Sequence, residues 1–320
     1  MQGLVTVFGG SGFVGRYAVR ALAKAGWRVR VAVRRPHLAP ELKVMGDVGQ
    51  IELVQANVRN AVSVEQALEG ADAVVNLVGV LYQHGPQGFK ALHAQAAGLI
   101  AEQAAARGIK RFVQVSAIGA KPKGGAAYSR TKAAGEAAVR KAIPEAVVLR
   151  PSVVFGPEDQ FFNRFAAMAS VSGIIPLIGG GKAKLQPVYA GDVGAAIVAG
   201  LDPARAGQTF ELGGPETYTF RELMELVVRE TGRKTSLLTI PTLFARPIAM
   251  AGDILTLTPV PPPLTSDQVT LLKRDNVCDP AVPGFAALGI APTAVEAVVP
   301  QYLWRFRDGG QFARIAKWAA

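Results

Sequence analysis

The sequence predicts an α/β protein built on a doubly wound, Rossmann-type parallel sheet, followed by a smaller C-terminal α/β domain. Two observations carry this prediction. An apolar, β-branched run at residues 3–8 leads directly into a glycine-rich turn at 9–15 and then into a helical pattern at 17–25. After that unit, continuous Val/Leu runs alternate with amphipathic helices as far as residue 150, which is typical of a parallel sheet covered on both faces.

The elements of the first half follow one another at short intervals. Strands are expected where apolar runs lie between turn signals, and helices where apolar residues recur with helical spacing. The expected strands are residues 3–8, 29–33, 51–55, 73–78, 111–116 and 146–149. The expected helices between them are residues 17–25, 63–69, 89–107 and 128–142.

Beyond Arg150 the pattern loosens, because Gly, Pro and aromatic residues interrupt it. The elements expected in this half are a helix at 192–201, a strand at 209–212 and a helix at 220–231. We therefore expect a nucleotide-binding domain at residues 1–150 and a smaller domain at 151–320. Residues 185–212 are expected to return the chain to the first domain, because they end in a strand.

The composition is that of a globular protein. Half of the 320 residues are hydrophobic and 18% are charged, which is enough apolar surface to bury a core. Cys278 is the only cysteine, so the chain can form no internal disulfide, and a reducing compartment is expected. No metal is expected, because the histidines lack metal-ligand spacing, and surface or helix positions are expected for His37, His84 and His93.

Charge and hydropathy bound the partners and the compartment. The formal net charge is +11, which favours anionic partners, yet no nucleic-acid motif or basic–aromatic stripe is present, so we expect no nucleic acid. No apolar stretch reaches the roughly 18 residues of a membrane span. Because the sequence opens on a core strand, we expect no signal or transit peptide.

The glycine-rich turn has the spacing that a dinucleotide pyrophosphate requires. Glycines let the backbone turn sharply and approach the phosphates, and the helix N-terminus that follows faces the anion with unpaired N–H groups. The alternative is an ordinary glycine-rich turn between a strand and a helix. The expected cofactor contacts here are Gly9, Gly10, Ser11, Gly12, Phe13, Val14, Gly15 and Arg16.

The tip of the second strand predicts which dinucleotide is bound. Arg34 and Arg35 stand where a carboxylate would bind the ribose 2′-hydroxyl of NAD, and arginine accommodates a 2′-phosphate instead. The sequence therefore favours NADPH, unless the two arginines are only solvated. Asn57, with Val58 beside it, is placed either to touch the adenine ring or to cap a turn.

Three further residues form a candidate proton-transfer site. Ser116 closes the fifth expected strand, and Tyr128 and Lys132 lie four residues apart on one helix face. A phenol acts as a general acid or base if a neighbouring ammonium lowers its pKa. The sequence therefore predicts a Ser–Tyr–Lys site next to the dinucleotide. Further expected cofactor contacts are Leu77, Val78, Gly79, Val115, Ser116, Tyr128, Lys132, Pro151, Ser152 and Val153.

These motifs together resemble the short-chain dehydrogenase/reductase superfamily. The glycine spacing is similar to its extended and atypical branches, and residues 150–157 resemble the segment that contacts the nicotinamide in that family. Phe155 stands where that segment usually has Tyr, and Phe8 stands where extended members usually have Thr. The resemblance covers residues 1–215.

A narrower resemblance runs through almost the whole chain. Residues 31–36, 46–51, 114–119, 155–163, 186–189 and 263–269 resemble the nucleotide-binding accessory subunit of respiratory complex I (NADH:ubiquinone oxidoreductase), in an alphaproteobacterial form. The resemblance implies a tightly held NADPH with a structural or assembly role and no established turnover. It also implies other complex I subunits as partners. The implied position is peripheral, on the cytoplasmic side of the bacterial inner membrane near the quinone region.

Two other classes remain open from the residues alone. The first is a free NADP(H)-dependent reductase, epimerase or dehydratase that uses Ser116, Tyr128 and Lys132, in which Lys132 binds the ribose and lowers the pKa of the phenol. The second is a redox-sensing or scaffold protein that has NADP(H) as a ligand.

Four apolar or aromatic segments allow two interpretations each. Residues 237–263 are apolar with few charges, and residues 302–307 and 314–318 interleave aromatic and cationic side chains. Both compositions suit a membrane or partner interface, and both also suit packing on the second domain. The aromatic cluster at 161–165 is placed either to line a substrate cleft or to pack within the protein.

Overall fold

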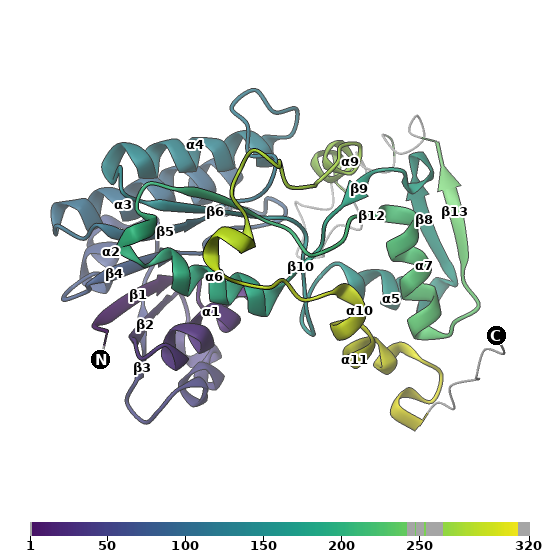
Figure 1. The fold of residues 1–320 in the computed structure, drawn as a ribbon, viewed down its shortest axis with the longest axis horizontal. Coiled ribbons are helices and arrows are strands. Elements are labelled where there is room, and N and C mark those ends of the chain that lie inside the picture. The colour runs from purple at the N-terminus through teal and green to yellow at the C-terminus, as the bar shows by residue number, and fades with distance from the viewer. Residues whose placement is uncertain (1, 242–246, 248–252, 254–264, 313–320) are drawn as a thin grey trace.

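The computed structural model describes residues 2–241, 247, 253 and 265–312. Its centre is a seven-stranded parallel sheet in the order β11-β6-β5-β4-β1-β2-β3, so the predicted doubly wound Rossmann-type fold is confirmed (Figure 1). The order reverses between β1 and β4, which is where such sheets bind ligands. The strands are β1 (Leu4–Phe8), β2 (Arg28–Val33), β3 (Ile51–Gln55), β4 (Ala73–Asn76), β5 (Arg111–Val115), β6 (Val147–Pro151) and β11 (Thr209–Leu212).

Helices cover both faces of this sheet, which is why its strands are continuous apolar runs. One buried cluster joins the sheet to α1 (Phe13–Lys24) and α6 (Ala190–Gly200). A second cluster joins its other face to three helices, α2 (Ala61–Ala67), α3 (Ala96–Ala106) and α4 (Ala127–Ala142).

The helix predicted at 89–107 begins differently from the expectation. Residues Lys90–Gln95 form a π-helical segment that continues into α3. Gly135 of α4 lies directly against this segment, since a Cβ at Gly135 would overlap the His93 carbonyl. The wider turn therefore coincides with an unusually close approach of two helices, which helical periodicity does not reveal.

Much of the described chain beyond β6 forms a smaller α/β unit beside the carboxyl ends of the sheet (Figure 1). It contains three two-stranded pairs, β10–β7, β12–β9 and β13–β8. Their strands are β7 (Val154–Phe155), β8 (Ile174–Ile178), β9 (Lys184–Leu185), β10 (Val188–Tyr189), β12 (Tyr218–Thr219) and β13 (Ser236–Ile240). The helices of the unit are α5 (Phe162–Ser172), α7 (Phe220–Thr231), α9 (Ser266–Leu272), α10 (Val295–Val298) and α11 (Pro300–Leu303). Strand β11 returns to the main sheet, whereas the division at residue 150 stays a prediction.

The aromatic cluster packs within this unit. Phe162 is fully buried, and the rings of Phe161 and Phe165 meet Phe220 edge-on. Tyr302 and Leu303 are buried in the same core. The packing interpretation therefore holds for residues 161–165 and for the start of 302–307, while 314–318 lie outside the described residues.

The β8–β13 pair has an apolar outer face. The strands are parallel, with Ile174 opposite Ser236 and Pro176 opposite Leu238, so side chains of these pairs share a face. Leu238 is 54% exposed and Ile174 45%. Most of the predicted interfacial segment 237–263 lies outside the described residues, but its first part is this exposed strand β13.

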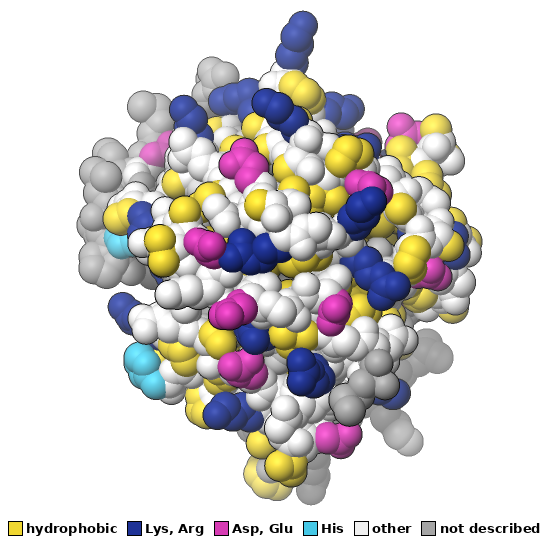
Figure 2. All heavy atoms as spheres, turned by 90° about the vertical axis from the view of Figure 1, so that its left-hand side faces the viewer, with side chains coloured by type: hydrophobic (Ala, Val, Ile, Leu, Met, Phe, Trp, Pro, Cys, Tyr) yellow, Lys and Arg dark blue, Asp and Glu magenta, His cyan; other side chains and the backbone are white. Residues whose placement is uncertain are grey.

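On one face of the molecule, basic side chains are scattered and form no continuous patch. Figure 2 shows Lys and Arg side chains spread over one face of the molecule, interspersed with acidic and apolar side chains. This face therefore offers no continuous basic stripe for a nucleic acid. Within the described part of the chain, the structure contains no helix with the length and apolar character needed to cross a membrane.

Candidate dinucleotide site

The glycine turn lies between β1 and α1 and is shaped to receive an anion. Gly9 has φ +83°, a conformation that favours glycine, and a Cβ at Gly15 would overlap the Gly9 carbonyl. Gly12 is the N-cap of α1, yet no side chain caps this helix and its first turn has no acidic residue. The first-turn N–H groups therefore lack an internal anion, which suits a bound pyrophosphate.

The adenosine end of the expected site is an open hollow of about 480 Å³. It is lined by Arg34, Gln55, Ala56, Asn57, Ser63 and Gln66. Arg34 and Arg35 are exposed, and neither guanidinium forms an ion pair or a hydrogen bond with any residue in the described ranges. The Arg34 guanidinium, which lines the hollow, can therefore bind a phosphate without breaking an internal contact.

Asn57 caps a turn, as one of its two sequence-based interpretations expects. Its Oδ1 accepts a hydrogen bond from the Arg59 N–H at 3.1 Å, which caps the turn after β3. Its own N–H donates to Ser63 Oγ at 2.9 Å. The residue also lines the hollow, so contact with an adenine ring stays a prediction that this fixed position allows.

The middle of the site follows the end of β4. Asn76 Nδ2 donates to Gln114 Oε1 at 2.9 Å, and its Oδ1 accepts from the Val78 N–H at 3.1 Å, so this amide fixes the start of the loop. A Cβ at Gly79 would lie 3.2 Å from Lys132 Nζ and 3.7 Å from His93 Nε2. Gly79 therefore brings the loop into close contact with both side chains.

The structure brings the predicted Ser–Tyr–Lys residues to the same end of the sheet. Lys132 is buried, with Nζ 3.3 Å from the Val115 carbonyl and 5.9 Å from the centroid of the Tyr128 ring. Burial lowers the pKa of Lys132 to about 8, against an opposing effect of Glu136. The Ser116 hydroxyl is buried without a hydrogen-bond partner among the described residues, so a ligand oxygen there would satisfy it.

The environment of Tyr128 opposes the expected role of Lys132. Burial, and then the charge of Asp267, raise the pKa of Tyr128 to about 12. The Asp267 carboxylate accepts hydrogen bonds from the N–H groups of Ala127 at 2.6 Å and Tyr128 at 3.0 Å. The net shift of the Tyr128 pKa is therefore upward, opposite to the direction expected from the nearby ammonium, and the proton-transfer role of Tyr128 stays a prediction.

His93 is the residue that sequence reasoning missed. It lies in a helix as expected but is only 1% exposed. Its Nε2 accepts from the Val80 N–H at 3.0 Å, its Nδ1 lies 3.2 Å from Thr131 Oγ1, and its ring meets Tyr128 edge-on. Burial and the Lys132 charge lower its pKa to about 3, so the imidazole is neutral. No spacing in the sequence links His93 to Tyr128, because the contact depends on how α4 packs.

The expected nicotinamide-contacting segment, 151–153, lies where the sheet passes into the smaller unit. Ser152 Oγ lies 2.6 Å from Asn276 Oδ1, so this side chain is engaged inside the protein. The Pro151 carbonyl accepts from the Ile118 N–H, and the Val153 carbonyl from the Val188 N–H. Val153 also packs against the core of the smaller unit, so contact between this segment and a nicotinamide stays a prediction.

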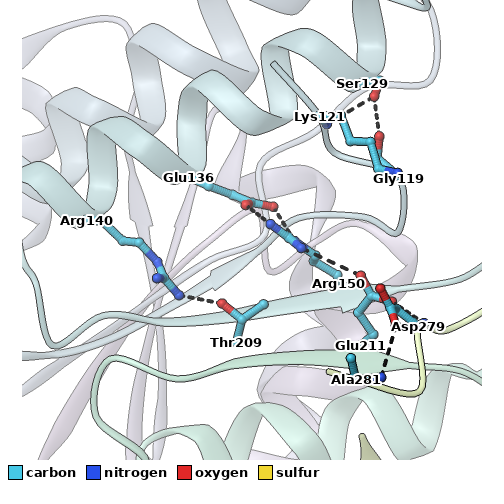
Figure 3. Close-up of polar contacts among 10 residues, drawn as sticks. All are labelled: Gly119, Lys121, Ser129, Glu136, Arg140, Arg150, Thr209, Glu211, Asp279 and Ala281. Atoms are coloured by element: carbon cyan, nitrogen blue, oxygen red, sulfur yellow. Dashed lines mark hydrogen bonds and ion pairs between the residues drawn. The ribbon is translucent and has the colours of Figure 1, made fainter. Parts of the chain in front are cut away.

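A network of charged side chains lies where the main sheet passes into the smaller unit. Arg150 donates to both Glu136 oxygens, at 3.0 and 2.7 Å, and lies 3.6 Å from Glu211 (Figure 3). Glu211 Oε2 accepts from the Asp279 N–H at 2.8 Å, and the Glu211 N–H donates to the Pro283 carbonyl. The segment 276–283, called the strap below, is thereby held against the edge of the main sheet.

Cys278 lies in this strap. Its N–H donates to Gln186 Oε1 at 3.0 Å, and burial followed by the Glu211 charge raises its pKa to about 11. The thiol is half-buried beside Gly213. Within the described ranges, no group of His, Cys, Asp and Glu side chains is arranged to hold a metal ion.

These features define a Rossmann-type nucleotide-binding protein with a Ser–Tyr–Lys site. The chain belongs to the NAD dependent epimerase/dehydratase family, whose model matches residues 5–213. Among solved structures, the dTDP-glucose 4,6-dehydratase DesIV of Streptomyces venezuelae, with NAD and TYD bound, has a TM-score of 0.71 at 19% identity and covers 95% of this chain and 96% of that one. This likeness shows the fold.

Within that family, the chain is a homologue of complex I accessory subunits. It is 37% identical to NADH dehydrogenase (ubiquinone) 1 alpha subcomplex subunit 9 of Arabidopsis thaliana, over 97% of this chain and 80% of that protein. It is 34% identical to the NADH-ubiquinone oxidoreductase 40 kDa subunit of Neurospora crassa, over 96% of this chain and 80% of that protein. A ceramide reductase of Caulobacter vibrioides is 30% identical, over 75% of this chain and 74% of that protein.

Proposed function

We propose that this protein is an NADPH-holding accessory subunit of respiratory complex I, and that its nucleotide serves structure or assembly rather than turnover. The observation that carries the proposal is the 37% identity to a complex I subunit along 97% of the chain. The geometry of the site supports a nicotinamide dinucleotide, because a glycine turn, an uncapped helix N-terminus and an unpartnered Ser116 hydroxyl lie along one edge of the sheet in the described part of the chain.

The preference for NADPH over NADH rests on Arg34 and Arg35. Both guanidinium groups are exposed, and Arg34 lines the hollow in which the adenosine half would lie. A 2′-phosphate gains charge-assisted hydrogen bonds from arginine, whereas the 2′-hydroxyl of NADH gains less.

The nicotinamide supplies hydride chemistry in this family's fold, and here the protein's own residues favour retention. The α1 N-terminus would bind the pyrophosphate, and the Lys132 ammonium would bind a ribose hydroxyl. Ser116 would donate to or accept from the ligand. Tyr128 stays protonated because burial and Asp267 raise its pKa to about 12, which makes it a poor base at neutral pH.

The proposed position is peripheral, on the cytoplasmic side of the bacterial inner membrane near the quinone region, with other complex I subunits as partners. The exposed apolar face of β8–β13 supports contact with a partner or a membrane surface, because isolated proteins seldom expose such faces.

The test is purification of the protein from native membranes, followed by analysis of its bound nucleotide. We expect it to co-purify with NADH:quinone oxidoreductase activity and to carry NADPH. Tyr128→Phe is expected to leave activity and assembly unchanged, like the control Tyr82→Phe. If a soluble carbonyl compound consumes the bound NADPH at about one per second, and Tyr128→Phe abolishes this, the protein is a reductase instead.

A further inference from the structure

Helix α4, which carries Tyr128 and Lys132, does not cap its own N-terminus. Its N-cap residue is Ala126, which has no side-chain acceptor, and its first turn contains no acidic residue. The missing acceptor comes from Asp267, about 140 residues further along the chain. Each carboxylate oxygen accepts one N–H of the first turn, so Asp267 satisfies two groups that would otherwise lack partners.

Asp267 is available for this contact because α9 is capped by other residues. Thr265 and Gln268 form a reciprocal capping box at the start of α9, so that helix does not need the Asp267 carboxylate. The loop before α4 also lies close to α9 and to the residues that follow it. A Cβ at Gly125 would lie 3.3 Å from Arg274 Nη2 and 3.5 Å from Thr270 Cγ2.

The other end of this contact chain is tied to the predicted interfacial segment. The Ser266 N–H donates to Asp253 Oδ1 at 3.0 Å, and Asp253 belongs to residues 237–263. A continuous chain of contacts therefore runs from this segment through α9 and Asp267 to the first turn of α4. There it reaches Tyr128, whose ring lies against His93 and 5.9 Å from Lys132 Nζ.

We propose that Asp267 is a positioning residue that locks α4 to α9, so that the protein retains its nucleotide only while α9 is docked. The inference rests on the proposed function, because it makes retention of the proposed nucleotide depend on α9. By linkage, a ligand that is held only in the docked state must also stabilise that state. Undocking of α9 would then release the nucleotide, and binding of the nucleotide would stabilise docked α9.

Hydrogen exchange on the full chain tests the lock without relying on the nucleotide. Asp267→Ala is expected to lower the protection of residues 265–272 and 121–131 together. Asp267→Asn keeps one acceptor. Protection of both segments in this variant is expected to lie between that of Asp267→Ala and that of the native chain. The matched control is Asp275→Ala, because Asp275 accepts from the Lys184 N–H in the same region but is not the residue that caps α4. If Asp267→Asn and Asp267→Ala leave 121–131 as protected as in the native chain, the lock does not exist.

The rate at which NADPH is released tests whether the contact between α4 and α9 controls retention of the nucleotide. Loss of two charge-assisted hydrogen bonds is expected to speed release of NADPH from Asp267→Ala by about tenfold, with Asp275→Ala within about twofold of the native rate. Added NADPH should raise protection of 265–272 in the native chain but not in Asp267→Ala. Equal release rates in all variants would overturn the coupling. A native chain that binds no NADPH, with the exchange result intact, would instead overturn the proposed function alone.

Discussion

Tyr128 lies with its ring edge-on to both His93 and Phe89, on a helix whose first turn is held by Asp267. The residue types around it are those of a proton-transfer site, but their charges are not arranged as such a site requires. Burial lowers the pKa of Lys132 to about 8, so its ammonium is the main form at neutral pH and is lost as the pH rises through 8. At the residue scale, the raised pKa of Tyr128 supports the proposal that the nucleotide is retained.

Replacing Arg34 tests the cofactor preference at this scale. Arg34→Asp is expected to weaken retention of NADPH by at least about tenfold, while retention of NADH changes little, because the new carboxylate repels a 2′-phosphate and accepts a 2′-hydroxyl. Equilibrium titration with both dinucleotides measures the two affinities. The matched control is Arg20→Asp on helix α1, which makes the same change of charge at an exposed position outside the hollow. Equal losses for NADPH and NADH would show that Arg34 does not recognise the phosphate.

His93 makes stability depend on pH. Its pKa is about 3 in the folded protein and near 6.5 when unfolded, so only the unfolded state gains a proton as pH falls below about 6.5. The native state should lose up to about 2 kcal/mol between pH 6.5 and 5 from this residue. Urea unfolding of the native chain and of His93→Gln, which has no titrating ring, should give the steeper loss in the native chain. Parallel pH profiles would contradict this role.

At the scale of elements, three helices satisfy their first turns in different ways, and a fourth does not. Helix α7 has a reciprocal box between Thr219 and Glu222, α2 uses Asn60, and α4 uses Asp267 from a distant helix. Helix α1 alone among these four is left without a cap, and it is the one that follows the glycine turn. The proposed dinucleotide would supply the missing acceptor at α1 through its pyrophosphate.

Thr219→Ala tests this logic on a helix away from the nucleotide. Removal of an N-cap acceptor costs about 1 kcal/mol of unfolding free energy. Retention of NADPH should not change, because α7 packs within the smaller unit. Denaturant unfolding and nucleotide release measure the two effects. A loss of retention as large as that of Asp267→Ala would mean that general stability, not the lock, controls release.

The main sheet was predictable because its strands are buried on both faces, so their apolar runs carry the signal themselves. The glycine turn was predictable because its signal also lies in consecutive residues, 9–15. The π-helical segment was not, because it depends on the approach of Gly135 to His93. The cap of α4 was not predictable either, because Asp267 is distant in the sequence and its role exists only after both units fold.

At the scale of the whole molecule, the Arg150 network couples the sheet edge to the strap. Glu136 and Glu211 have side chains only 9% and 8% exposed, so the guanidinium of Arg150 compensates two buried carboxylates. Buried ion pairs of this kind contribute less to the free energy of unfolding than their geometry suggests. Removing one partner is nevertheless costly, because it leaves a buried charge uncompensated.

Arg150→Met should therefore destabilise the protein by about 3 kcal/mol at neutral pH. The exposed pair Lys110–Glu145 supplies the control, since Lys110→Met should cost less than about 1 kcal/mol. Denaturant unfolding of both variants measures the difference. A cost for Arg150→Met no larger than that for Lys110→Met would show that the network is not needed to hold the strap.

The reactivity of Cys278 reports whether the strap is held against the sheet. It is the single thiol of the chain, it lies in the strap, and its pKa of about 11 leaves very little reactive thiolate at neutral pH while the strap is closed. Every opening of the strap would expose a thiol with an ordinary pKa. The rate at which a thiol reagent labels the unmodified protein therefore reports how often the strap opens, with no engineered probe.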